Sequence, residues 1–273
     1  MNTKKLLLLL VAMTMVFSLT ALAAKAPATV TSKTVKLSGK FDKIAVSSGL
    51  EVDYTVNHSA PEAVISGLKE YVDRVEVKVS GGTLYVGFDN SGMRNVRIND
   101  KELDKIIING PALSKADASS GAEIDIVSSM ETDGGLSVNI SSGAEFDMKG
   151  ALKCRSLIIN ASSGAEADIR SAVVTDKTHI DVSSGSDCSV DFLDMKHGAL
   201  IINASSGAEA DVKGMAGSAV LNASSAAEIK AGKLSAGTIT ANASSAASIK
   251  CSGRNVQKSE STLGSVKIVK EGR

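Results

Sequence analysis

Aromatic residues are scarce in this chain, and tryptophan is absent. Aromatic side chains make up only 3% of the 273 residues, whereas hydrophobic residues as a whole reach 43%. A buried core is therefore available, but small and aliphatic side chains must fill it.

Cysteine, proline and net charge are sparse as well. Three cysteines are too few, and odd in number, for a disulfide scaffold. Three prolines beside 24 glycines fit neither collagen nor a proline-rich linker. The 30 basic residues balance the 30 acidic ones, so the chain lacks the positive charge that non-specific nucleic-acid binding requires. We expect no nucleic-acid partner.

The N-terminus has the features of a secretory signal peptide. Lys4 and Lys5 precede an apolar run, Leu6 to Leu22, which ends in the small-x-small sequence Ala21-Leu22-Ala23. We predict a signal peptide at residues 1–23 and an exported mature chain, in the periplasm or at the cell surface. No later segment is apolar for the length of a membrane-spanning helix, so we expect none in the mature chain.

A repeat of about 20 residues indicates a solenoid. Ser-Ser pairs recur every 19 to 22 residues, beginning at Ser119, Ser141, Ser162, Ser183, Ser205, Ser224 and Ser244. Leucine is too scarce for leucine-rich repeats, and the Gly-Gly-x-Gly-x-Asp sequence of calcium-binding rolls is absent. The remaining solenoid, with one coil per repeat, is an all-β, single-stranded parallel β-helix of about 20–22 residues per coil.

Polar and apolar residues alternate within each repeat, as they do in strands. One apolar column comprises Ile124, Phe146, Ala167, Cys188, Ala210, Ile229 and Ile249. One polar column comprises Asp117, Asn139, Asn160, Asp181, Asn203, Asn222 and Asn242. Because like residues of successive coils stack, we expect the polar column to form hydrogen bonds along the axis. Glycine follows most Ser-Ser pairs, but Ala226 and Ala246 replace it in two coils, where we expect a less strained or differently shaped corner.

The chain divides into five segments. After the signal peptide at 1–23 come a linker or first strand at 24–40 and a β-helix domain at 41–253. Within that domain we expect an irregular capping β layer at 41–112 and regular coils at 113–253. Gly81-Gly82 predicts a hairpin in the capping layer. Residues 254–273 are expected to form a closing strand and a tail.

Several of these motifs together resemble a known family. They are Phe41-Asp42-Lys43-Ile44, then Ser48-Gly49-Leu50-Glu51-Val52, then Gly82-Thr83-Leu84-Tyr85-Val86, followed by the Ser-Gly-Ala-Glu coils. The combination resembles the putative auto-transporter adhesin head GIN domain family, over roughly residues 41–253. The resemblance implies a β-helix-like fold in a secreted protein of Bacteroidetes-type bacteria and an adhesin role. It carries over no catalytic or binding residues.

An acidic column is the one feature of the repeats that could be a binding site. It comprises Glu123, Glu145, Glu166, Asp187, Glu209 and Glu228. Stacked carboxylates repel one another, and a calcium ion between coils would relieve the repulsion. The alternative is a solvated acidic face balanced by neighbouring lysines and arginines. We expect no obligatory cofactor.

Two classes of function remain open. The first is a non-catalytic binding or structural protein that contacts a surface polymer, a glycan or a protein through its repetitive polar face. The second is a polysaccharide-active lyase or glycosidase. Such an enzyme needs a local cluster of acids and bases, and the regular repeats contain no such break. We predict no catalytic residues. If a ligand binds, the less regular segments 170–180 and 191–199 are where it is expected.

Overall fold

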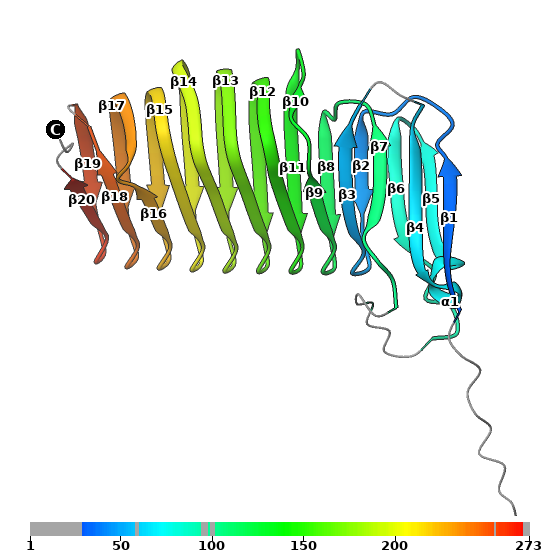
Figure 1. Ribbon diagram of the computed structural model, residues 1–273. Helices are drawn as coiled ribbons and strands as arrows, with labels where there is room; N and C mark the ends of the chain where they lie inside the picture. Colours follow the sequence, from blue (N-terminus) through cyan, green and yellow to red (C-terminus); the bar gives the residue numbers. More distant parts are fainter. Residues whose placement is uncertain (1–28, 58–59, 94–97, 99–101, 254, 270–273) are drawn as a thin grey trace, which may run out of the picture.

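The computed structural model describes residues 29–57, 60–93, 98, 102–253 and 255–269. It is nearly all β-structure and forms a β-solenoid of about seven turns along one long axis (Figure 1). The expected parallel β-helix is thereby confirmed. Helix α1 (Lys69–Val72) is four residues long, and no helix within the described ranges is long and apolar enough to cross a membrane. The predicted signal peptide lies outside these ranges.

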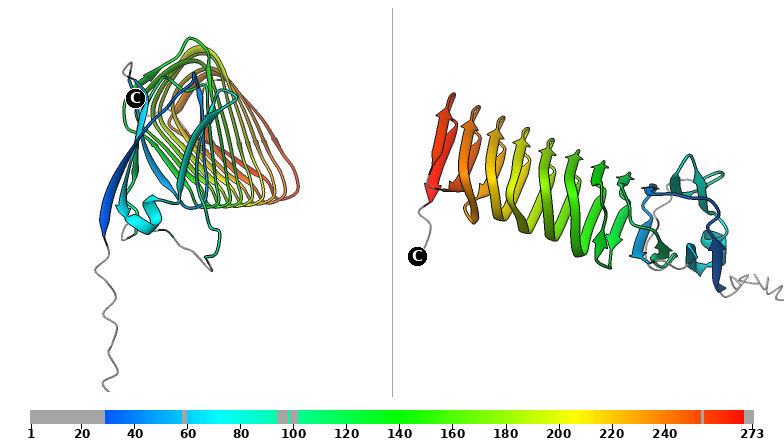
Figure 2. Two further views of the ribbon diagram at one scale, coloured as in Figure 1. Left: turned by 90° about the vertical axis from the view of Figure 1, so that its right-hand side faces the viewer. Right: turned by 90° about the horizontal axis from the view of Figure 1, so that it is seen from above.

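Viewed along its axis, the solenoid has a triangular outline (Figure 2). One face, called here the Asn–Ser face, holds the strands that precede the Ser-Ser corners, and the next, the acidic face, holds the strands that follow them. The Asn–Ser face consists of β2 (Lys43–Val46), β8 (Lys115–Ser119), β11 (Gly135–Ser141), the ends of β12 (Glu145–Ser162), β13 (Glu166–Val182), β14 (Asp187–Ala204) and β15 (Glu209–Ala223), and then β17 (Leu234–Ala243) and β19 (Val256–Glu260). The acidic face consists of β3 (Glu51–Val56), β9 (Glu123–Ile126), the starts of β12 to β15, β16 (Glu228–Ala231), β18 (Ser248–Ser252) and β20 (Ser265–Val269). The third face contains β10 (Met130–Glu131) and the middle parts of β12 to β15.

Successive coils pair in parallel and place equivalent residues side by side. Between β12 and β13, for example, Glu145 pairs with Glu166 and Asn160 with Asp181. Each coil therefore hydrogen-bonds to the coils on both sides, which satisfies the backbone without local hairpins. The spacing of about 4.8 Å between strands sets the spacing of every side-chain column.

The core follows the alternation expected from the sequence. The apolar column that begins at Ile124 and contains Phe146 and Cys188 is buried, with no member more than 3% exposed. An alanine or serine occupies the position just after each of the seven corners between Ser119 and Ala247, for example Ala165 and Ser186, and is equally buried. Small side chains here let the chain turn closely around the core.

The corners are two-residue turns in which both central residues have positive φ. In one coil these are Ser163 at φ 57° and Gly164 at φ 70°. In the coil of Ala226 the preceding Ser225 has φ 52° and Ala226 has φ 62°. The expectation of a differently shaped corner at Ala226 and Ala246 is therefore wrong. Hydrogen bonds between stacked turns, such as Ala226 N–H to the Ser245 carbonyl at 2.9 Å, hold alanine in the same conformation as glycine.

The N-terminal end of the solenoid is closed by a separate set of strands. The hairpin of β5 (Val75–Ser80) and β6 (Thr83–Phe88) confirms the turn expected at Gly81-Gly82, and β6 adds in parallel to β2. On the acidic face, β7 (Ile106–Gly110) adds to β3, and antiparallel β4 (Glu62–Leu68) and β1 (Val30–Lys36) follow. The change to antiparallel pairing ends the stack of coils and covers the core at this end.

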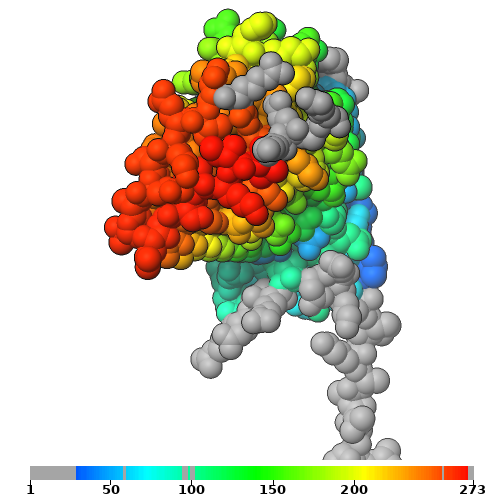
Figure 3. Space-filling model, turned by 90° about the vertical axis from the view of Figure 1, so that its left-hand side faces the viewer, coloured from blue at the N-terminus to red at the C-terminus, as the bar shows by residue number. Residues whose placement is uncertain are grey.

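The regular coils begin earlier than residue 113. Strands β2 and β3 pair in parallel with β8 and β9, so Glu51 stacks on Glu123 and Asp53 on Asp125. Residues 43–56 thus form a true coil within the segment 41–112, which was expected to be a less regular β layer that starts the solenoid and covers its open end. About 60 residues of cap separate this coil from its neighbour along the chain, so a search for a 20-residue period does not detect it. At the other end, β19 and β20 extend the stack by one coil. The orange and red residues of the C-terminal region cover this end of the solenoid in Figure 3.

Candidate functional site

A ladder of side-chain amides runs along the Asn–Ser face. This Asn ladder comprises Asp117, Asn139, Asn160, Asp181, Asn203, Asn222 and Asn242. The Nδ2 of each asparagine donates to the Oδ1 of the residue one coil closer to the N-terminus, at 2.6–2.9 Å. The predicted stacking is confirmed, and all the amides point in one direction, which strengthens each bond through its neighbours.

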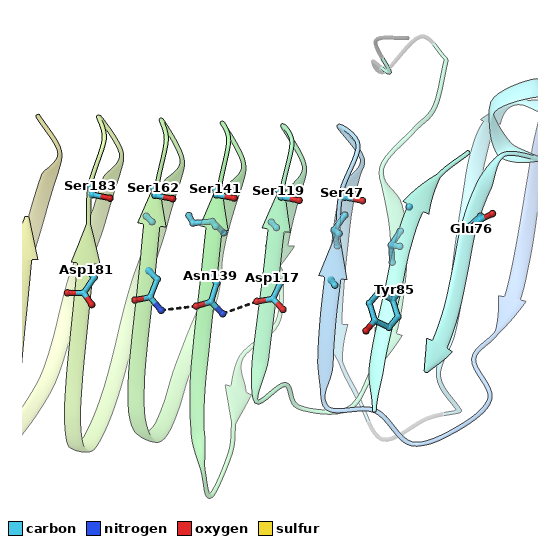
Figure 4. A pocket seen from close by; sticks show the side chains of 18 of the residues that line it. Ser47, Glu76, Tyr85, Asp117, Ser119, Asn139, Ser141, Ser162, Asp181 and Ser183 are labelled. Carbon is cyan, nitrogen blue, oxygen red and sulfur yellow. Dashed lines mark hydrogen bonds between the residues drawn. The ribbon is translucent and has the colours of Figure 1, made fainter. Parts of the chain in front are cut away.

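The Asn ladder is interrupted once, at Asp181. Asn160 donates to Asn139, so its Oδ1 lies on the side of Asp181. A carboxylate can only accept, and no hydrogen bond joins these two side chains in the described structure (Figure 4). The carboxylate of Asp181 instead accepts from Asn203 at 2.6 Å and lies 3.2 Å from His179 Nε2.

A groove of about 630 Å³ hollows the capped end of the Asn–Ser face (Figure 4). Ala45 of β2 pairs with Tyr85 on one side and with Asp117 on the other, so a small side chain separates two large ones. The hairpin supplies Lys78, which pairs with Tyr85, and Glu76, two residue pairs further along. Tyr85 is 43% exposed, so its ring is open to a ligand.

From Asp117 the groove continues over the Asn ladder and the adjacent serines as far as Asp181 and Ser183. A second hollow of about 370 Å³ begins at Asn203 in the next coil and covers the last coils of the same face. The two hollows together follow the whole Asn ladder. The face is therefore a recessed strip of amides, hydroxyls and a few carboxylates.

The predicted acidic column lies on the acidic face, and lysines neutralise its two ends. Lys105 Nζ lies 2.7 Å from Glu123 and 2.8 Å from the adjacent Asp125, and 3.8 Å from both Glu51 and Asp53. It thus joins the first two coils. At the C-terminal end, Lys230 donates to Glu209 and lies 3.9 Å from Glu228, whereas Lys149 and Lys213 bind aspartates in neighbouring positions.

The pKa values of these carboxyls follow their partners. Burial alone would raise the pKa of Asp125, which is 1% exposed, but hydrogen bonds from Lys105 and Lys149 outweigh it and hold the pKa below its ordinary value. Burial raises the pKa of Glu123 despite the bond from Lys105. Glu123 is therefore part of the cap contact rather than a free surface group.

The middle of the acidic column, Glu145, Glu166 and Asp187, forms no ion pair within the described residues. Burial raises the pKa of Glu166, and the nearby charges of Asp168, Glu145 and Asp187 raise it further. Across the described ranges, no group of three or more His, Cys, Asp or Glu side chains is arranged to hold a metal ion. A calcium ion between coils stays a prediction.

Sequence reasoning missed the groove next to the cap. Its distinctive residues are Tyr85, Lys78 and Glu76, which come from the hairpin of β5 and β6. The sequence predicts this hairpin, but it does not predict that β6 pairs with β2. The segments 170–180 and 191–199, where a ligand was expected if one binds, contribute no residue to the lining of either hollow. The alternation within β6 places Tyr85 on the outward side, and this was the one sequence feature that could have pointed to the groove.

Comparisons with known proteins agree with this architecture. The sequence profile of the family described as "Putative auto-transporter adhesin, head GIN domain" matches residues 40–187 and 157–271. A search of the curated proteins gives no match.

Several solved structures share the fold. A "putative lipid binding protein" of Parabacteroides distasonis is 18% identical, with a TM-score of 0.75 over 88% of this chain and 96% of its own. A "putative adhesin" of the same organism is 16% identical, with a TM-score of 0.74 over 89% and 98%. A "putative adhesin" of Parabacteroides merdae is 18% identical, with a TM-score of 0.66 over 88% and 96%. At these identities the likeness concerns the fold alone.

Proposed function

The chain belongs to the family described as putative auto-transporter adhesin, head GIN domain, and on that premise we propose that it is an exported, adhesin-like binding protein without catalytic activity. Its proposed location is the periplasm or the cell surface. Two of the solved relatives above are named adhesins, which supports a role in binding.

The observation that carries this proposal is the regularity of the outward faces. Most coils present an amide, a serine hydroxyl and a carboxylate at equivalent positions, at intervals of about 4.8 Å. Such an array suits a repetitive partner, because many weak contacts add up by avidity. A catalytic centre requires one acid–base pair that differs from its neighbours, and regular columns do not favour it.

The chemistry of the faces favours a polar partner. One solved relative is named a lipid-binding protein, but the outward columns described here carry amides, hydroxyls and carboxylates. A surface polymer, a glycan or a protein fits these groups. Calcium would strengthen binding if it bridged the unpaired carboxylates of Glu145, Glu166 and Asp187 to an anionic partner.

The test is adhesion of the purified chain to immobilised polysaccharides, mucin and matrix proteins, with calcium and with a chelator. Replacing Glu123, Glu145, Glu166 and Glu209 together by alanine should weaken adhesion, whereas Glu166→Ala alone should change little. A triple variant that keeps Glu123 controls for the loss of the Lys105 contact.

If the quadruple variant adheres as strongly as the parent, the acidic column does not take part in binding. Failure of the parent to adhere to any of these surfaces contradicts the binding role. Release of reducing sugar from a polysaccharide, abolished by one substitution, would establish an enzyme instead.

A further inference from the structure

The groove at the capped end combines three features that the repeats elsewhere do not share. One is the open ring of Tyr85, 43% exposed. The second is the hollow over Ala45, between that ring and Asp117. The third is the interruption of the Asn ladder at Asp181, which lies at the far end of the same groove.

The interruption is a site for a hydrogen-bond donor. The Oδ1 of Asn160 and the carboxylate of Asp181 are both acceptors on adjacent strands, with no proton of either side chain to share. Elsewhere in the Asn ladder a donated N–H fills this position. Two neighbouring hydroxyl groups of a ligand can each donate to one of the two acceptors, whereas a carboxylate or phosphate has no proton to donate.

The charges and the length of the groove set two further requirements for a ligand. Glu76, Asp117 and Asp181 outnumber Lys78, and Asp117 already accepts from Asn139 and from Lys115. The groove is therefore unfavourable to polyanions. Tyr85 occupies the same column as Asp181, five strand spacings away, or about 24 Å. A ligand that contacts both ends must be elongated.

We propose that this groove binds a linear, uncharged glycan that runs along the solenoid axis, with one sugar ring against Tyr85 and two neighbouring hydroxyls that donate to Asn160 and Asp181. A peptide fits less well, because the strands on this face pair with coils on both sides and offer no free edge for β-addition. The proposal deepens the adhesin-like role and rests on it.

The experiment is calorimetric titration of the purified chain with cellohexaose, xylohexaose, mannohexaose and chitohexaose, and with hexagalacturonate as the anionic comparison. We expect at least one uncharged hexasaccharide to bind and the anionic one not to. Tyr85→Ala should weaken binding at least tenfold. Asp181→Asn should weaken it at least fivefold, because its Nδ2 can donate to Asn160 and close the gap.

Phe192→Ala is the matched control, since Phe192 is 71% exposed and does not line the groove. It should bind like the parent. A thermal midpoint near that of the parent verifies that each variant is folded. Binding unchanged in both groove variants overturns the site, and so does the absence of binding to every uncharged hexasaccharide. If the chain still adheres to mucin or a matrix protein in that last case, the adhesin-like role stands and only the glycan groove is wrong.

Discussion

Two corners of the solenoid carry alanine in a backbone conformation that favours glycine, and replacing it should stabilise the protein. Ala226 and Ala246 both have φ 62°, and Gly207 in the preceding coil has φ 72°. A side chain with a Cβ costs about 1–2 kcal/mol in this left-handed region. Glycine removes most of this strain, but it lowers the stability by about 0.4–1 kcal/mol because it gives the unfolded chain more conformational freedom. The expected net gain is about 0.5–1 kcal/mol per corner.

The assay is urea unfolding of the single and double variants, followed by far-UV circular dichroism. Ala226→Gly with Ala246→Gly should raise the free energy of unfolding by about 1–2 kcal/mol, or the midpoint temperature by about 2–6 °C. The reverse change, Gly207→Ala, should lower stability by a similar amount per corner. A Cβ at Gly207 would meet no atom within 4 Å, so the effect is one of backbone strain alone.

The neighbouring Ala227 provides the control. It is 1% exposed and is not among the residues with positive φ, so Ala227→Gly should destabilise the protein. If Ala226→Gly destabilises the protein as Ala227→Gly does, the strain argument is refuted. The same holds if Gly207→Ala is neutral.

Three further predictions concern side chains of the acidic face and the core. Lys105→Met should lower the stability at pH 7 by about 2 kcal/mol, because it leaves the buried Asp125 with Lys149 alone. The pKa of Asp125 is depressed in the fold, so its charged form stabilises the protein above the ordinary aspartate pKa of about 3.9. This stabilisation is lost as the pH falls through the lower pKa of the folded state. The free energies of unfolding of parent and variant, measured in urea, should therefore converge below pH 4. Glu166→Gln should raise the stability at pH 7 by about 0.5 kcal/mol, because the pKa of Glu166 is raised and its charge is unfavourable in the fold. This gain should disappear below the ordinary glutamate pKa of about 4.3, and Glu209→Gln, which removes a partner of Lys230, should give no gain at pH 7. Cys154, Cys188 and Cys251 are all buried, and burial raises the pKa of Cys154 to about 11, so maleimide labelling detected by mass spectrometry should require unfolding.

The solenoid could be predicted because the two features that define it, the alternation within a strand and the period of the repeat, can be read from short stretches of sequence. Alternation over a few residues identifies the strands, and a constant period stacks equivalent residues, so the buried column at Phe146 and the hydrogen bonds of Asn139 and Asn160 follow directly. The acidic column was placed correctly for the same reason. Its electrostatics were not predictable, because Lys105 comes from the chain segment before the repeats and reaches Glu123 only through the packing of the cap.

Non-local pairing explains the remaining differences. Nothing in the sequence states that β2 inserts between β6 and β8, yet this insertion adds a coil and brings Tyr85 into line with Asp117. The conformation of Ala226 is likewise set by the coils on either side, since their turns bond to one another. Cooperative stacking here overrides the local preference of alanine, which sequence reasoning had taken as decisive.

The position of Asp181 links the regularity of the fold to the proposed function. An asparagine there could donate to Asn160 and accept from Asn203, and the Asn ladder would continue without interruption. The aspartate instead leaves one acceptor of Asn160 without a donor from its neighbour and adds a negative charge to the groove. The coils are held together by repeated contacts, and an aspartate in place of an asparagine at this exposed position adds no hydrogen bond between them. Such a departure is expected where a ligand supplies the missing donor, and it lies in the same groove as the exposed ring of Tyr85.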